Sequence, residues 1–337
     1  MSYVLLTGGA GYIGSHTALA LLRAGERVIS FDNYSNSSAE SLSRVDQLAG
    51  KSVVQIKGDV LDADALAAVF KQYPVKAVVH FAGLKAVGES TQKPLWYYET
   101  NVGGTIKLCQ VMAEFGVKNL VFSSSATVYG NAQNSPLPET TPTVAMNPYG
   151  QSKLMTEWVL QDLQRSDSSW NIAVLRYFNP VGADASGCIG EDPNGIPNNL
   201  MPFITQVAVG KRSELQIFGS DYPTADGTGV RDYIHVTDLA EGHVAALQHL
   251  SKGEGFDVFN LGSGLGLSVL DIVTRFAAVN QLEVPYQFVE RRPGDVARYF
   301  ADPSKAKTVL NWQTEKTLDD IVRDSWNWQK NNPDGYI

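Results

Sequence analysis

The sequence has little cysteine, no excess of positive charge and no long hydrophobic run. Two cysteines, Cys109 and Cys188, are too few for a disulfide framework and lack metal-ligand spacing, so we expect no metal site and two reduced thiols. The 27 lysines and arginines are outnumbered by 35 acidic residues, giving a net charge of −8, which argues against a nucleic-acid partner. No apolar run approaches the length of a membrane span, so no membrane partner is expected.

The first residues, MSYVLLTGGAG, also lack the basic and apolar regions of a secretion signal, because a glycine loop interrupts them by residue 8. A cytoplasmic location is therefore expected. Hydrophobic residues make up 44% of the 337 residues and charged residues 18%, which is typical of a globular protein with a full core. This length predicts about two domains.

Short apolar runs alternate with amphipathic segments in the first half of the chain. This alternation predicts an α/β fold of the Rossmann type, a doubly wound parallel sheet covered by helices on both faces. The pattern loosens near residue 180, so we expect a domain over 1–180 and a smaller α/β lobe over 181–337, interleaved with it. Strands are predicted over 3–7, 27–32, 52–59, 77–83, 119–125, 172–182 and 258–261, and helices over 13–25, 62–72, 93–115, 199–210, 268–279 and 317–330.

The motif TGGAGYIG places Gly8, Gly11 and Gly14 between the first predicted strand and the first predicted helix. Glycines in this context allow a tight turn and a close approach of the backbone to a pyrophosphate at the helix N-terminus. The alternative is an ordinary glycine-rich turn. The position between strand and helix favours a dinucleotide-binding loop.

Asp32 ends the second predicted strand, 18 residues after Gly14 (32 − 14 = 18). A carboxylate there accepts hydrogen bonds from the adenosine ribose and repels a 2′-phosphate, so the predicted cofactor is NAD rather than NADP. Asp59 follows the third predicted strand. It either meets the adenine or caps the next helix, and the sequence favours neither.

The stretch NPYGQSK places Tyr149 and Lys153 one helical turn apart if a helix begins near Pro148. Taken alone, the pair fits an ordinary polar helix face as well as it fits a catalytic pair. The spacing G-x-x-G-x-x-G and the segment SSSATVYG, together with this pair, resemble the extended short-chain dehydrogenase/reductase family. The resemblance implies a catalytic set of Ser125, Tyr149 and Lys153, with Ser125 lying 24 residues before the tyrosine (149 − 125 = 24).

Further segments narrow the resemblance to one branch of that family. HFAGLKAVGES, YFNPVGA, GIPNNLMPF, GTGVRDYIHV and RRPGDVARYFAD look like UDP-glucose 4-epimerases, also called UDP-galactose 4-epimerases, and the similarity spans essentially the whole chain. It implies reversible interconversion of UDP-galactose and UDP-glucose through a 4-keto intermediate that rotates and is reduced again with tightly bound NAD. The alternatives are another NAD-dependent nucleotide-sugar oxidoreductase, or a 4-epimerase of N-acetylated UDP-hexosamines.

The resemblance also implies the residues of both binding sites. For NAD it implies Gly8, Gly11, Tyr12, Ile13, Gly14, Asp32, Asn33, Asn36, Ser37, Asp59, Val60, Phe81, Ala82, Gly83, Lys85, Thr100, Asn101, Tyr149, Lys153, Tyr177 and Phe178. For the UDP-sugar it implies Ser125, Tyr149, Phe178, Asn179, Asn199, Leu200, Gln216, Ile217, Phe218, Arg231, Arg292, Asp295 and Tyr299.

Some of these residues have simpler interpretations. Arg231 could form a surface ion pair with Asp232 or Asp238, and Asn199 could cap the helix that follows it. Arg292, which follows another arginine, could belong to a solvated turn. The resemblance also suggests a homodimer that pairs residues 93–115 and 149–165 of each subunit, although such apolar faces also pack inside monomers.

Overall fold

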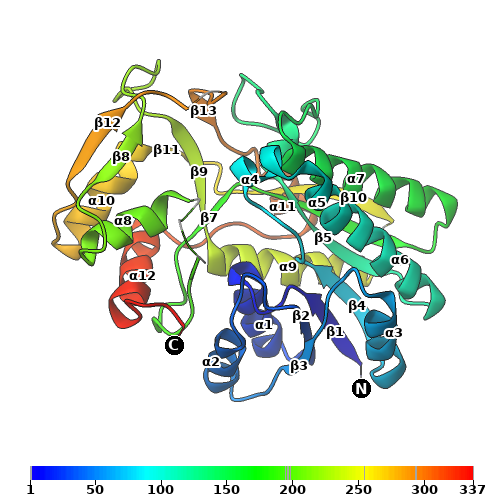
Figure 1. Ribbon diagram of the computed structural model, residues 1–337. Coiled ribbons are helices and arrows are strands. Elements are labelled where there is room, and N and C mark those ends of the chain that lie inside the picture. The colour runs from blue at the N-terminus through cyan, green and yellow to red at the C-terminus, as the bar shows by residue number, and fades with distance from the viewer. Residues whose placement is uncertain are drawn as a thin grey trace.

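The computed structural model describes residues 2–336 apart from 194, 196, 198, 254 and 293. Its centre is a seven-stranded sheet in which every pair of neighbouring strands is parallel, in the order β10-β6-β5-β4-β1-β2-β3 (Figure 1). This order reverses between β1 and β4, and ligands of open α/β sheets bind at the carboxyl ends of the strands beside such a reversal. The strands are β1 (Tyr3–Thr7), β2 (Val28–Asp32), β3 (Val54–Lys57), β4 (Val75–His80), β5 (Asn119–Ser125), β6 (Asn171–Tyr177) and β10 (Phe256–Leu261).

Helices cover both faces of this sheet because successive residues of a buried strand point to opposite sides. In β1, Val4 and Leu6 belong to one core, and Tyr3 and Leu5 belong to the other. The first core is covered by α1 (Tyr12–Arg23), α2 (Ala39–Ala49) and α9 (Val236–Leu250), and the second by α3 (Ala63–Gln72), α6 (Gly104–Glu114) and α7 (Pro148–Ser166). The predicted fold class is confirmed.

Several elements from beyond residue 180 belong to the seven-stranded sheet or pack on it. Strand β10 forms its edge beside β6, and helix α9 packs on α1. The short helix α11 (Ser304–Val309) packs against β10. Elements from beyond residue 180 therefore complete one edge of the large sheet and part of its helical cover.

Two smaller sheets and three helices lie to one side of the large sheet (Figure 1). Their residues form a third core, which includes Ile204, Ile217, Phe276 and Ile321. The strands are β7 (Asn179–Val181), β9 (Val230–His235), β11 (Gly266–Ser268) and β13 (Arg298–Tyr299) in one sheet and β8 (Leu215–Phe218) and β12 (Tyr286–Val289) in the other, and the helices are α8 (Leu200–Ala208), α10 (Val269–Asn280) and α12 (Leu318–Asn331).

Two predicted elements are divided in the structure. The strand expected over 172–182 ends at Tyr177, and its continuation β7 leaves the large sheet to pair with β9. The helix expected over 93–115 is a short α5 (Pro94–Tyr97), a π-helix η1 (Tyr98–Gly103) and then α6. A π-turn inserted in a helix re-aims its side chains and is often found at functional sites. The short helix α4 (Val87–Gln92) precedes α5.

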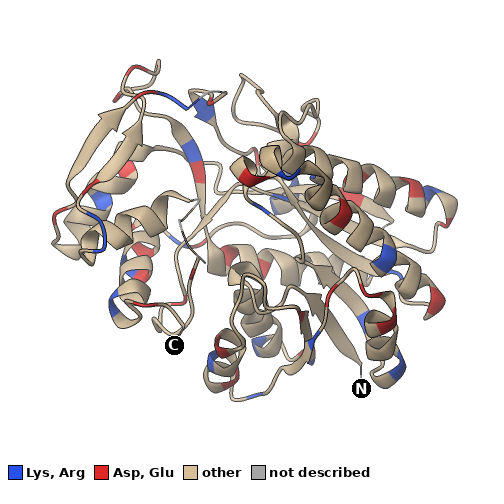
Figure 2. Cartoon of the chain, in the orientation of Figure 1, with Lys and Arg blue, Asp and Glu red and all other residues tan. Residues whose placement is uncertain are grey.

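Acidic and basic residues are interspersed along the outer helices (Figure 2). Among the described residues, no group of three or more His, Cys, Asp or Glu side chains could hold a metal ion. No helix of the described part of the chain is long and apolar enough to cross a membrane.

Candidate active site

Helix α7 sets the positions of Tyr149 and Lys153. Pro148 occupies its first turn, and the side chain of Asn147 caps it by accepting a hydrogen bond from the amide of Gly150 at 2.9 Å. Both features are typical of a helix start, so the local sequence fixes where the helix begins. The tyrosine and the lysine therefore lie on one helix face, as predicted.

The end of β5 meets that helix face. The Nζ atom of Lys153 donates to the carbonyl oxygen of Ser123 at 2.6 Å, and it lies 5.0 Å from the centre of the Phe122 ring. Ser125 is the last residue of the strand, and its side chain acts on the phenol of Tyr149 to lower the pKa of that phenol. The three predicted catalytic side chains are thus brought together by the packing of α7 on β5.

Burial controls the protonation of this group. It raises the pKa of Tyr149 above its usual value, and the hydrogen bond from Ser125 acts in the opposite direction. Burial also lowers the pKa of Lys153 to about 8, against the attraction of the Glu157 carboxylate. The protein alone therefore favours a neutral phenol, beside a lysine that loses its proton only a little above neutral pH.

The glycine loop lies between β1 and α1, where each glycine meets a different constraint. Gly8 has φ +72°, and a Cβ on it would lie 2.8 Å from the amide nitrogen of Ala82. A Cβ on Gly14 would lie 2.4 Å from the carbonyl oxygen of Gly8, whereas one on Gly11 would meet nothing closer than 3.4 Å. The outer two glycines permit the tight loop itself, and Gly11 keeps its surface open at the start of α1, as a pyrophosphate site requires.

Asp32 lies at the carboxyl end of β2 beside this loop. Its carboxylate accepts hydrogen bonds from the amides of Ala10 at 3.0 Å and Tyr34 at 2.9 Å and from the hydroxyl of Ser37 at 2.9 Å. Four lone-pair sites leave room for a further donor such as a ribose hydroxyl. Asn36 lies in the same loop.

Asp59 does not cap helix α3, because that role belongs to Asp62, which accepts from the amide of Ala65. Asp59 instead accepts from the side-chain amide of Asn33 at 2.9 Å and from the amide of Leu61. The helix-cap interpretation of Asp59 is therefore wrong. Val60, the next residue, is buried.

The segment after β4 forms another wall of the site. The amides of Phe81 and Ala82 donate to the carbonyl oxygen of Thr7 at 2.9 and 3.0 Å, which ties this segment to the end of β1. Asn101 in the π-helix is buried, and it exchanges hydrogen bonds with both backbone groups of Leu84. A third bond, to Ser152, joins Asn101 to α7. Asn101 thus uses its side chain to position the 81–85 loop, while its neighbour Thr100 is half-buried.

Comparison with known proteins identifies the family. A family model described as GDP-mannose 4,6 dehydratase matches residues 5–325. The UDP-glucose 4-epimerase of Bacillus subtilis (strain 168) is 57% identical over 333 residues, covering 99% of this chain and 98% of that protein. The human UDP-glucose 4-epimerase is 56% identical over 340 residues, covering 99% and 98%. The chain belongs to the UDP-glucose 4-epimerase family.

Solved structures of this family superpose closely on the chain. The enzyme from Stenotrophomonas maltophila, solved with bound NAD and formylated UDP-arabinopyranose, has a TM-score of 0.97 at 48% identity and covers 99% of each chain. The enzyme from Bifidobacterium longum, solved with NAD⁺ and UDP, has a TM-score of 0.95 at 52% identity and covers 99% of this chain and 100% of that one.

Several residues that the family resemblance implies are bonded to the protein itself. Tyr12 donates its hydroxyl to the carbonyl oxygen of Gly182 at 2.7 Å, and the side chain of Asn179 donates to the carbonyl oxygen of Asp232 at 2.9 Å. Tyr177 is buried, and its hydroxyl is hydrogen-bonded to the ring of His243. It belongs to the same hydrophobic core as Ala10 of the glycine loop. Ile13 is the second residue of α1, and Leu200 is the first of α8.

Arg231 does not form either of the ion pairs that the sequence offered as its alternative role. The nearest carboxylate of Arg231 is that of Asp295 at 3.7 Å, and its Nη1 atom donates to the carbonyl oxygens of Val230 and Val296. Asp232 is instead buried, where it accepts hydrogen bonds from residues 263, 264 and 301, and Asp238 accepts from the amide of residue 316. The proposed Arg231–Asp232 and Arg231–Asp238 pairs are wrong.

Strand β8 presents Gln216 and Phe218 outward while Ile217 lies in the core. Only the backbone of Ile217 is therefore available to a ligand. Arg292 is exposed and lies outside the helices and strands, and its guanidinium lies 3.9 Å from the centre of the Phe218 ring.

Glu191 is a residue that the sequence did not single out. Its carboxylate accepts from the side-chain amide of Asn199 at 2.9 Å and lies 3.4 Å from the Nζ atom of Lys85. Asn199 precedes α8 but makes no side-chain cap bond to it, which contradicts the simple capping role. No local pattern predicts these contacts, because residues 85 and 191 meet only through the tertiary fold.

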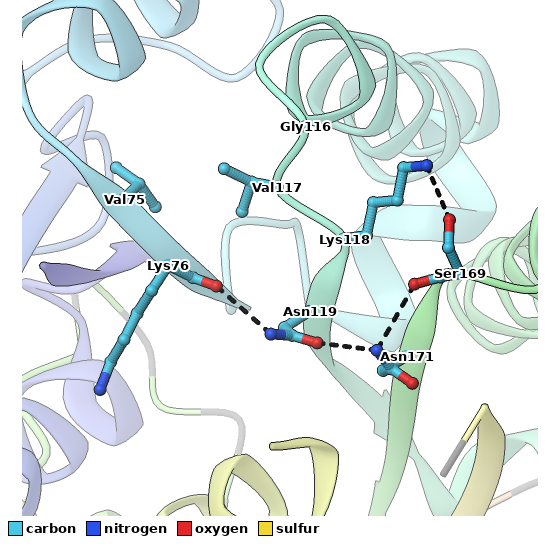
Figure 3. A pocket seen from close by; sticks show the side chains of 8 residues that line it. All are labelled: Val75, Lys76, Gly116, Val117, Lys118, Asn119, Ser169 and Asn171. Atoms are coloured by element: carbon cyan, nitrogen blue, oxygen red, sulfur yellow. Dashed lines mark hydrogen bonds between the residues drawn. The ribbon is translucent and has the colours of Figure 1, made fainter. Parts of the chain in front are cut away.

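A separate hollow of about 470 Å³ lies at the opposite end of the sheet (Figure 3). Val75, Lys76 and Asn119, at the amino ends of β4 and β5, contribute to its walls. Lys76 forms an ion pair with Glu26, and the side chain of Asn119 donates to the carbonyl oxygen of Lys76. None of the predicted site residues lines this hollow, so it is distinct from the candidate active site.

Proposed function

We propose that the protein interconverts UDP-galactose and UDP-glucose by changing the configuration at carbon 4 of the sugar, with tightly bound NAD. The observation that carries this proposal is the meeting of Ser125, Tyr149 and Lys153 at the end of β5, beside a glycine loop, in a chain of the UDP-glucose 4-epimerase family.

The cofactor half of the site is assigned to the large-sheet domain over 1–180. The steric limits on Gly8 and Gly14 and the acceptor at Asp32 support NAD as the cofactor. When bound, NAD accepts the hydrogen of the oxidised carbon as a hydride and returns it. We assign the UDP-sugar to the lobe over 181–337, where Arg231 and Arg292 would neutralise the diphosphate.

Tyr149 would take the proton of the sugar 4-hydroxyl and later return it. A phenol titrates near pH 10, so a base that works near neutral pH requires a downward pKa shift of about three units, about 4 kcal/mol. The raised pKa in the protein alone implies that positive charge near the phenol supplies this shift. Lys153 supplies part of that charge, and Ser125 shares the hydrogen bond to the reacting hydroxyl.

A dehydratase has less support, although the matching family model carries that description. Elimination of water requires an acid and a base near carbons 5 and 6 of the sugar. The residues after Ser125 are Ala126 and Thr127. The hydroxyl of Thr127 donates a hydrogen bond to Ser125 at 2.9 Å. Neither Ala126 nor Thr127 has a carboxylate that could act as the acid or the base of the elimination.

The test is to incubate the purified protein with UDP-galactose without added NAD. We expect UDP-glucose to form until equilibrium, without accumulation of NADH. Steady growth of NADH absorbance upon addition of NAD would instead indicate an ordinary dehydrogenase. Absence of UDP-glucose even with added NAD would contradict the proposal.

Tyr299 supports glucose and galactose rather than their N-acetylated forms. Its hydroxyl donates to the carbonyl oxygen of Ala126 at 2.5 Å, and its ring centre lies 5.9 Å from that of Phe178. A bulky side chain anchored there leaves little room for an acetamido group. We expect UDP-GlcNAc to be a poor substrate, and comparable efficiency on both sugars would contradict this assignment.

The oligomer is proposed to be a homodimer. Large apolar side chains are exposed on neighbouring helices of one region, and a second copy of the same surface would cover them. They are Leu95 and Trp96 on α5, Ile106 on α6, and Met155 and Trp158 on α7.

We also propose a cytoplasmic location, since the free thiols of Cys109 and Cys188 suit a reducing compartment.

A further inference from the structure

The helix face that carries Tyr149 and Lys153 continues one turn further to Glu157. The three residues are four positions apart, so their side chains lie one above another along α7. The Glu157 carboxylate is 5% exposed, and it receives hydrogen bonds from Arg176 at 3.0 and 2.6 Å and from the hydroxyl of Ser124 at 2.5 Å. Charged donors on both oxygens fix this buried carboxylate in place.

The strand end Ser123–Ser125 contacts all three helix residues in turn. Its first residue accepts from Lys153 through the carbonyl oxygen, and its second donates a hydroxyl to Glu157. Its third, Ser125, lowers the pKa of the Tyr149 phenol. Any slip of α7 along β5 would break both hydrogen bonds together.

We propose that Glu157 is a positioning residue for the reaction: with Ser124 and Arg176 it holds α7 in register on β5, and it places a carboxylate one helical turn from Lys153. This inference rests on the proposed roles of Tyr149 and Lys153. It adds a third helix residue to the pair, one that contacts neither substrate nor cofactor.

The histidine and tyrosine side chains around Lys153 are neutral, so the Glu157 carboxylate is the charge that affects the pKa of this lysine. On β4, His80 is held neutral because burial, and then the lysine itself, lower its pKa to about 3. The phenols of Tyr149 on α7 and Tyr177 on β6 are uncharged, since burial raises the pKa of both. Glu157 opposes the burial that lowers the pKa of Lys153, so removing its charge would release the lysine's proton at a lower pH.

The second charge of the ion pair acts in the same direction. Arg176 on β6 is paired with Glu157, and it also donates to the hydroxyl of Tyr129 at 3.0 Å. If Glu157 becomes neutral, the arginine remains as an unbalanced cation near Lys153. Like charges disfavour protonation, so the pKa of Lys153 would fall further.

The test compares Glu157→Gln with Glu157→Asp. The pH profile of kcat/KM reports the groups of the enzyme before substrate binds. With Gln, we expect the decline of kcat/KM at alkaline pH to move to lower pH by about one unit, and kcat/KM at pH 8 to fall about fivefold. With Asp, which keeps the charge, the decline should stay at its wild-type pH even if kcat falls through lost register.

Asp162→Asn is the matched control, because it removes one acidic charge from the exposed side of the same helix. It should leave the profile unchanged. A buried ion pair that loses one partner can destabilise a protein strongly. If Glu157→Gln does not fold, Glu157→Gln combined with Arg176→Met removes both charges. The alkaline shift should then keep its direction but be smaller, because no unpaired arginine adds to it.

An alkaline decline that stays at its wild-type pH in the folded Gln or double variant would overturn the inference. Equal profiles for Asp and Gln would also overturn it, because a purely structural role does not distinguish them by charge. A wild-type protein without epimerase activity would instead refute the proposed function, so the two failures are distinguishable.

Discussion

At the scale of single residues, Tyr149 needs nearby positive charge to act as a base, because its buried surroundings favour the neutral phenol. Burial raises the pKa of its phenol, and Ser125 provides the one opposing hydrogen bond. Lys153 lies on the same helix face as Tyr149, and it donates a hydrogen bond to the carbonyl oxygen of Ser123 on β5. The protein, Lys153 included, thus positions the phenol without ionising it, and bound NAD would supply the further positive charge.

Replacing Tyr149 by Phe removes the hydroxyl that we propose exchanges the proton. We expect kcat to fall by about three orders of magnitude, within the range known for a positioned acid–base group. The NAD content of the purified protein should be unchanged, because the ring still fills its place. Turnover near the wild-type rate would show that another group is the base.

The pKa of Lys153 predicts how activity depends on pH. Burial lowers this pKa to about 8, so the lysine is charged below that pH and loses its charge as the pH rises through it. We expect kcat/KM to decline above about pH 8. Lys153→Arg keeps the charge at every accessible pH, so any activity that remains should decline at a higher pH. A decline at the same pH in both proteins would assign it to another group.

At the scale of elements, the start of α1 leaves no room for an added methyl group at Gly14. An alanine at Gly14 would place its Cβ 2.4 Å from the carbonyl oxygen of Gly8, which must then move. We expect Gly14→Ala to lower the NAD retained after gel filtration about tenfold or more. Gly88→Ala in α4 is the control, since no atom lies within 4 Å of its added Cβ. Equal retention in both variants would contradict the assigned role of the loop.

Local sequence predicted some elements much better than others. Helix α7 begins where Pro148 and the capping Asn147 indicate, because these residues act within one turn. Helix α9 was missed, since it follows β9 directly and no glycine or proline separates them. Its N-cap is His235, which accepts from the amide of Thr237 but is not one of the usual capping residues.

The candidate active site also contains residues that the sequence predicted and residues that it did not. Gly8, Asp32 and Tyr149 could be found because each belongs to a short motif with its own physical reason. The contacts of Glu157 with Arg176, and of Glu191 with Lys85, join separate elements. Such pairs depend on strand order and helix packing, for which a single sequence carries no local signal.

At the scale of the whole molecule, the exposed apolar side chains on α5, α6 and α7 predict association. Trp158 is 54% exposed, and Trp158→Glu would place a charge in the proposed interface. We expect the wild type to sediment as a dimer and this variant largely as a monomer. Leu265→Glu, at a residue 62% exposed elsewhere, should remain dimeric. A monomeric wild-type protein would contradict the proposal.

The central claim is that oxidation and reduction at one carbon of a UDP-sugar are performed by Tyr149, Lys153 and a retained NAD. The most direct measurement is conversion of UDP-galactose labelled with deuterium at carbon 4, without added NAD, followed by NMR of the product. We predict UDP-glucose that keeps the deuterium at carbon 4, because the hydrogen removed there returns to the same carbon. Loss of the deuterium to solvent, or a dehydrated product, would contradict the account.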